Sequence, residues 1–205
     1  TAGLPTGDDL KTAATAAYRR ADDAGVTYSK SAVQRIADAL TARFDELGFD
    51  PDLPVQGAKA AIGKVRKLLD NEEGASFSAI DTARKVASNG FEPGNKFNNK
   101  LIGEIVRALD DLVTNPKAGD VLAGNADEAA AAIKEGRKLY SQSAKLETFD
   151  RLMEKAGRRA ARTGSGANIE NTSRQELSKI LDSDRLKRGT TPDEIEAITR
   201  AVMGT

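Results

Sequence analysis

Apolar residues recur at helical spacing along almost the whole chain, and no segment shows the strict alternation that is typical of a strand. The clearest segment begins near Ser29 or Ser31 and ends at Gly48. Its apolar residues are three or four positions apart: Val33, Ile36, Leu40, Phe44 and Leu47. Since serine often caps the start of a helix and glycine often follows its end, this segment is predicted to form one amphipathic helix.

The same spacing predicts further helices on both sides of that segment. Their apolar positions lie within residues 10–23, 58–69, 80–86 and 97–112. Two turn-forming sequences separate some of them, namely residues 49–54, which contain two prolines, and residues 89–94, Asn-Gly-Phe-Glu-Pro-Gly. We expect the helices on either side of residues 89–94 to form an α-hairpin.

A much longer helix is predicted over Ala126 to Arg162, a stretch of about 37 residues without proline. It would be roughly 55 Å long at the usual rise per residue. Its small and apolar positions recur about every 3.5 residues, which is typical of a coiled-coil or bundle seam. Gly136 and Gly157 weaken this helix, so we expect a close helix approach or a kink at these two positions.

Two short helices are expected near the C-terminus. The first runs from about Asn168 through Leu181, and the second begins with a capping-box pattern from Thr191 to Glu194. The expected buried stripe of the second helix is Ile195, Ile198 and Val202. The whole pattern predicts an all-α, multi-helix bundle with an N-terminal section over residues 1–74. A C-terminal bundle over residues 75–205 is expected around the long helix.

The composition excludes several kinds of catalytic and metal site. The 205 residues include no histidine, no cysteine and no tryptophan, which excludes imidazole bases, thiol nucleophiles and metal sites built on His or Cys. We expect no catalytic residue, no cofactor and no metal ion. With 4% aromatic residues, the core must consist of Ala, Leu, Ile and Val. No apolar run approaches the roughly 20 residues that a membrane-spanning helix needs.

Local charge differs from the balanced total of 31 basic and 31 acidic residues. Residues 151–191 contain ten basic and five acidic residues, a net charge of +5. This segment could contact the phosphates of nucleic acid or an acidic partner, or it could simply form solvated helix faces. The candidate contact residues are Arg158, Arg159, Arg162, Arg185, Lys187 and Arg188.

Two other patterns could carry chemistry. The acidic residues Asp110, Asp111, Asp120, Asp127 and Glu128 could supply a carboxylate pair for hydrolysis or for a hard cation, or they could be solvated acids at helix ends. The glycine-rich turn over residues 163–168 resembles a phosphate cradle, but it lacks the Gly-Lys-Ser/Thr ending and no strand precedes it. A corner between two helices is the alternative for this turn.

Several motifs resemble a module of phage and prophage proteins. They lie at residues 163–177, 179–182, 187–189, 191–194 and 202–205, with further similarity at 80–87 and 105–112. The similarity covers roughly residues 25 to 205 and consists of glycines, helix caps and apolar positions. Such proteins resemble virion-associated structural or internal (DNA-ejection) components of tailed phages that infect alphaproteobacteria. No catalytic residue is carried over from this resemblance.

The resemblance implies a non-enzymatic protein that acts through helix–helix assembly, with copies of itself or with other virion proteins. Its location would be the virion or the bacterial cytoplasm. A nucleic-acid-binding helical module that uses the basic segment over residues 151–191 is the alternative. A carboxylate-based hydrolase is a third hypothesis.

Overall fold

The computed structural model describes residues 5–162, 168–183 and 190–204. It confirms the prediction of an all-α chain with one long helix. The chain divides into two compact units. Unit 1 comprises residues Thr1–Ala14 and Arg137–Thr205, and unit 2 comprises residues Thr15–Gly136. Helix α1 (Gly7–Asp23) and helix α6 (Ala126–Arg162) each contribute residues to both units.

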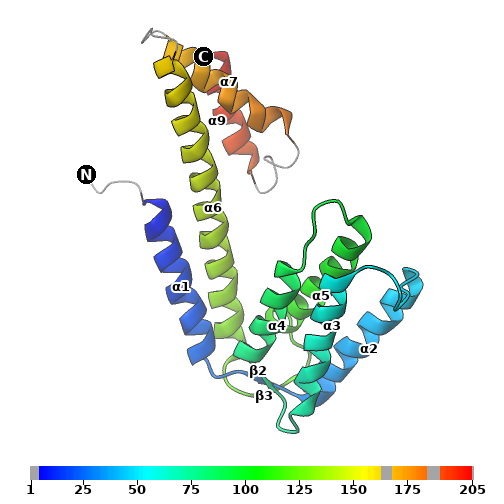
Figure 1. Ribbon diagram of the computed structural model, residues 1–205. Coiled ribbons are helices and arrows are strands. Elements are labelled where there is room, and N and C mark those ends of the chain that lie inside the picture. Colours follow the sequence, from blue (N-terminus) through cyan, green and yellow to red (C-terminus); the bar gives the residue numbers. More distant parts are fainter. Residues whose placement is uncertain (1–4, 163–167, 184–189, 205) are drawn as a thin grey trace. The chain divides into compact units, whose positions relative to one another are not determined.

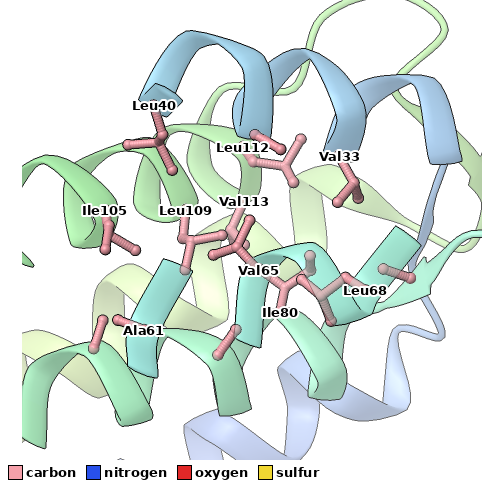
Figure 2. Packing of buried hydrophobic residues seen from close by; sticks show 14 of the residues in the cluster. Val33, Leu40, Ala61, Val65, Leu68, Ile80, Ile105, Leu109, Leu112 and Val113 are labelled. Carbon is pink, nitrogen blue, oxygen red and sulfur yellow. The ribbon is translucent and has the colours of Figure 1, made fainter. Parts of the chain in front are cut away.

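Unit 2 contains four helices of moderate length that pack around one apolar core (Figure 1). They are α2 (Lys30–Glu46), α3 (Gln56–Lys67), α4 (Phe77–Asn89) and α5 (Lys96–Thr114), and the short 3-10 helix η1 (Leu68–Asp70) follows α3. Figure 2 shows Leu40 of α2, Val65 of α3 and Leu109 of α5 among the residues of this core. Burying each large apolar side chain contributes about 1.5–3 kcal/mol, so this core is the main source of stability in unit 2.

The helix boundaries in unit 2 follow the predicted start and stop signals. The Ser29 hydroxyl accepts a hydrogen bond from the Ala32 amide at 3.2 Å, which caps α2. Gly48 follows α2 with a φ of +77°, as expected for a glycine that ends a helix. The Ser76 hydroxyl caps α4 by accepting from the Ala79 amide at 3.2 Å.

The expectation that the chain has no strand was wrong. Three short strands form an antiparallel sheet in the order β2-β1-β3. They are β1 (Thr27–Tyr28), β2 (Ala75–Ser76) and β3 (Val121–Ala123). Strands of two or three residues are too short to show an alternating pattern, so periodicity alone could not reveal them.

This sheet also explains why the observed units differ from the sections expected at residues 1–74 and 75–205. Thr27 pairs with Ser76, and Tyr28 pairs with Ala75, so hydrogen bonds join segments on both sides of residue 74. The core of unit 2 likewise contains residues from both expected sections. A boundary at residue 74 would therefore divide one core and one sheet.

Unit 1 consists of the first part of α1, the C-terminal part of α6, α7 (Asn168–Asp182) and α9 (Pro192–Met203). Helices α7 and α9 pack against each other. The capping box predicted for α9 is confirmed. The Thr191 hydroxyl accepts from the Glu194 amide at 3.3 Å, and the Glu194 carboxylate accepts from the Thr191 amide at 2.7 Å.

Two expectations about unit 1 were not met. The stripe predicted to be buried on α9, consisting of Ile195, Ile198 and Val202, is only half-buried, and α9 has no buried residue over its described length. A close helix approach, one of the two alternatives expected at Gly157, is absent, because an added Cβ there would meet no neighbouring described segment within 4 Å. Unit 1 is therefore less completely covered than the sequence pattern suggested. Among the described residues, no helix is long and apolar enough to cross a membrane.

Candidate functional site

An apolar groove lies in unit 1. Its volume is about 670 Å³. Residues of α1, α6, α7 and α9, or residues that flank these helices, line it. The apolar lining residues are Pro5, Leu10, Ala144, Leu146, Phe149, Ile180, Ala197 and Ile198. A groove of this size can hold several apolar side chains of a partner.

Helix α6 lines the groove with residues between Ser141 and Phe149. Leu146 is 36% exposed and Phe149 is 39% exposed, although both are large apolar side chains. Tyr140, which lies six residues before Leu146 on the same helix, is 58% exposed. These residues belong to the predicted 3.5-residue seam of α6, and α6 extends over the same residues that the sequence indicated. The seam is thus present but only partly buried.

An ion pair crosses the groove between α6 and α9. The Lys145 ammonium lies 2.9 Å from the Glu194 carboxylate. The hydrogen bond from the Thr191 amide, and then the one from Lys145, hold the pKa of Glu194 below its usual range. Glu194 therefore has two roles, because it completes the capping box of α9 and ties that helix to α6.

The beginning of α1 forms another edge of unit 1. The Ser143 hydroxyl of α6 donates to the Gly7 carbonyl oxygen at 2.9 Å, and Ser143 is buried. Lys11 forms an ion pair with Glu147, one helical turn further along α6. The Glu147 carboxylate raises the pKa of the Lys11 amine. Polar contacts thus hold α1 against α6 beside the apolar groove.

A buried carboxylate lies where α7 meets α6. Glu176 is fully buried, and its Oε1 accepts hydrogen bonds from Arg159 at 2.5 Å and from Lys179 at 2.6 Å. Its Oε2 is also buried and has no hydrogen-bond partner among the described residues. The hydrogen bond from Lys179 lowers the pKa of Glu176, and this outweighs burial, which acts in the opposite direction. The carboxylate is therefore charged at neutral pH.

The predicted basic contact residues have different environments. Arg159 pairs with the buried Glu176, and Arg158 pairs with Glu154 one turn before it at 3.3 Å. Arg162 is exposed at the end of α6. Arg185, Lys187 and Arg188 lie outside the described residues.

Two of the acidic residues considered for hydrolysis have basic partners. Asp110 pairs with Arg84 at 2.5 Å, whereas the buried Asp120 accepts from Arg35 at 2.7 Å. No group of three or more metal-ligating side chains occurs among the residues that the structure describes. The glycine-rich turn falls almost entirely outside those residues, since only Asn168 at its end is described.

The sequence analysis did not single out Glu176, because it treated this residue only as one of the acids in the basic segment. The spacing of Glu176 from its neighbours on α7 does, however, indicate that it is buried. Thr172, Glu176 and Ile180 are each four positions apart, so they share one face of α7, and all three are buried. A charged residue between such neighbours indicates a buried ion pair.

Comparison with known proteins adds no assignment to this site. No protein-family model, no curated protein and no solved structure matches the chain.

Proposed function

We propose that this chain is a non-enzymatic structural or internal component of a tailed-phage or prophage particle, and that it acts through helix–helix assembly. The observation that carries the proposal is the apolar groove of unit 1, in which Leu146 and Phe149 remain exposed. Exposed apolar surface of this kind marks a place where another protein binds. The resemblance of residues 25–205 to virion-associated proteins supports the assignment to a particle.

The partner that we propose for the groove is a second copy of the same chain. Unit 1 has 15 basic and 12 acidic residues, whereas unit 2 has 16 basic and 19 acidic residues. Their net charges are therefore +3 and −3. Opposite charges favour the encounter of unit 1 of one copy with unit 2 of another. Such contacts between unlike surfaces build rings or filaments.

Sedimentation velocity over a range of protein concentrations tests this assembly. We expect the wild-type chain to form larger species as concentration rises, and the Leu146→Ser/Phe149→Ser double variant to stay monomeric. The matched control is Ile169→Ser, because Ile169 is an exposed apolar residue of α7 in unit 1 that does not line the groove. A wild-type chain that stays monomeric at every concentration would overturn self-assembly through the groove. Equal loss of association in the control would also overturn it.

Assignment to a particle needs a separate measurement. Mass spectrometry of particles purified after prophage induction should detect peptides of this chain at a constant ratio to the major capsid protein. If the peptides occur only in the soluble cell fraction, the particle assignment is wrong. This result would leave the assembly of copies unaffected, so the two parts of the proposal can fail independently.

A further inference from the structure

The apolar face of α6 continues from the groove to the region beside α7 and α9. Leu146, Phe149, Met153, Ala156 and Ala160 are separated by steps of three, four, three and four residues, which places them on one face of the helix. The first two are exposed, whereas Ala156 and Ala160 are buried. Figure 1 shows α7 and α9 beside this later part of α6. The two helices thus cover only one end of a longer apolar face.

Little apolar surface holds α7 and α9, referred to below as the cover, against α6. The buried residues on this apolar face of α6 are alanines, whose side chains are single methyl groups. On the cover, Leu177 and Ile180 of α7 are buried, but α9 has no buried residue. Since apolar stabilisation scales with the area removed from water, the contact between α6 and the cover gains little from this source.

Ion pairs also contribute to the contact between α7 and α6. The buried Glu176 faces Arg159 and Lys155 of α6 and Lys179 of its own helix. Burying a carboxylate costs several kcal/mol, and the hydrogen bonds from Arg159 and Lys179 offset that cost in the closed state. Arg159 and Lys179 are half-exposed, so both can regain water if the contact opens. Closure therefore depends on these ion pairs more than on apolar burial.

We propose that α7 and α9 form a releasable cover on α6, and that the ion pair between Glu176 and Arg159 is its latch. Release returns the Glu176 carboxylate to water and exposes the apolar face from Leu146 to Ala160 as one continuous surface. The ion pair between Lys145 and Glu194 limits the opening at the groove end. This inference goes beyond the proposed function and does not depend on it, because opening requires no partner.

Single-cysteine variants can measure the opening directly, since the natural chain has no cysteine. Ala156→Cys reports on the covered face of α6, and Ala14→Cys reports on a buried position of α1 in the same unit. Ala83→Cys reports on the core of unit 2. Gly157→Cys is the exposed reference, because an added Cβ there meets no neighbouring described segment. Thiol labelling is followed at low protein concentration, where association between copies is negligible.

We expect the thiol at position 156 to react about tenfold or more faster than those at positions 14 and 83, but more slowly than the one at position 157. Combined with Ala156→Cys, Glu176→Lys should accelerate labelling about tenfold or more, because it places a third cation beside Arg159 and Lys179. Glu176→Met should also accelerate it, because this variant removes the ion pairs with Arg159 and Lys179 that form the latch.

Two outcomes would overturn the inference. In the first, the thiols at positions 156 and 14 react at the same rate, which means that unit 1 opens only by unfolding. In the second, the rate at position 156 does not respond to Glu176→Met. If Glu176→Lys also accelerates labelling at position 14, that variant unfolds unit 1, and the result with Glu176→Met decides. The assembly experiment above has a different readout, so either hypothesis can fail alone.

Discussion

Gly57 and Gly90 are in direct backbone contact, because a Cβ placed on Gly57 would lie only 2.2 Å from the carbonyl oxygen of Gly90. Gly57 lies in the first turn of α3, and Gly90 follows the last turn of α4. The buried Asn98 joins the same two segments. Its side chain accepts from the Ala58 amide at 3.0 Å and donates to the Gly90 carbonyl at 2.8 Å. The absence of side chains at both glycines permits this junction.

Replacing Gly57 with alanine should therefore destabilise unit 2. We expect Gly57→Ala to lower the free energy of unfolding by about 1–3 kcal/mol, because the new methyl group forces α3 and α4 apart. Gly63→Ala is the matched control in the same helix, where an added Cβ meets no described neighbour within 4 Å. It should raise the free energy of unfolding by about 0.5–1 kcal/mol. Urea unfolding measures both, and equal effects would refute close contact at Gly57.

The Asp120 carboxylate should make unit 2 sensitive to acid. Burial raises its pKa, but hydrogen bonds from Arg35 and from the Lys117 amide outweigh burial, so its pKa lies below the ordinary value of 3.8. A lowered pKa in the folded state contributes stability above the ordinary value, and this stability is lost as pH falls through the folded-state pKa.

The substitution Asp120→Asn tests this contribution. At about pH 7 the variant should be less stable by about 1–3 kcal/mol, because Arg35 loses its charged acceptor. The difference between variant and wild type should shrink below pH 3.8, where the wild-type carboxyl also becomes protonated. Urea unfolding at both pH values measures the difference. A gap that does not change with pH would show that the Asp120 charge does not contribute.

Helix α9 should depend strongly on its N-terminal cap, because it has no buried residue. Thr191→Ala removes the hydroxyl of the capping box and should destabilise the helix by about 1 kcal/mol. Thr199→Ala is the control within the same helix, where the hydroxyl donates to the Ile195 carbonyl at 2.8 Å and alanine has the higher helix propensity. Amide hydrogen exchange in α9 should become faster in the first variant and not in the second.

Nucleic-acid binding provides a test that separates the two main hypotheses of function. Because Arg158 and Arg159 both have acidic partners, we expect no DNA binding at moderate salt. A fluorescence anisotropy titration with duplex DNA at several salt concentrations measures it. Binding with a steep negative dependence on salt would favour a nucleic-acid-binding module instead. Replacing Arg185, Lys187 and Arg188 with serine would then show whether the remaining basic residues carry that binding.

Much of the fold could be predicted because its helices have local signals. Ser29 and Ser76 begin helices as hydroxyl caps, Gly48 ends one, and the capping box from Thr191 to Glu194 occurs as expected. Even the limits of α6 follow from its spacing and from the absence of proline. Each of these signals acts within a few residues, and this is the range over which sequence patterns are most informative.

The features that sequence reasoning missed depend on contacts between distant residues. The partner of Arg159 is Glu176 on the next helix, and a pattern of charges along the chain cannot indicate that pairing. The half-burial of Ile198 has a similar origin, because periodicity shows which face is apolar but not whether another element covers it. The groove combines a feature that sequence reasoning found with one that it missed. The apolar face of α6 was predicted, whereas its incomplete burial by other helices was not.

The small sheet of unit 2 has a consequence for the order of folding. Thr27 pairs with Ser76 on one side and with Ala123 on the other, so one two-residue strand joins segments from both halves of the unit. Contacts so distant in sequence form only after long loops have closed, and loop closure slows folding compared with bundles that have local contacts alone. The helices of unit 2 should thus form early, and closure of this sheet should limit the folding rate of a largely helical protein.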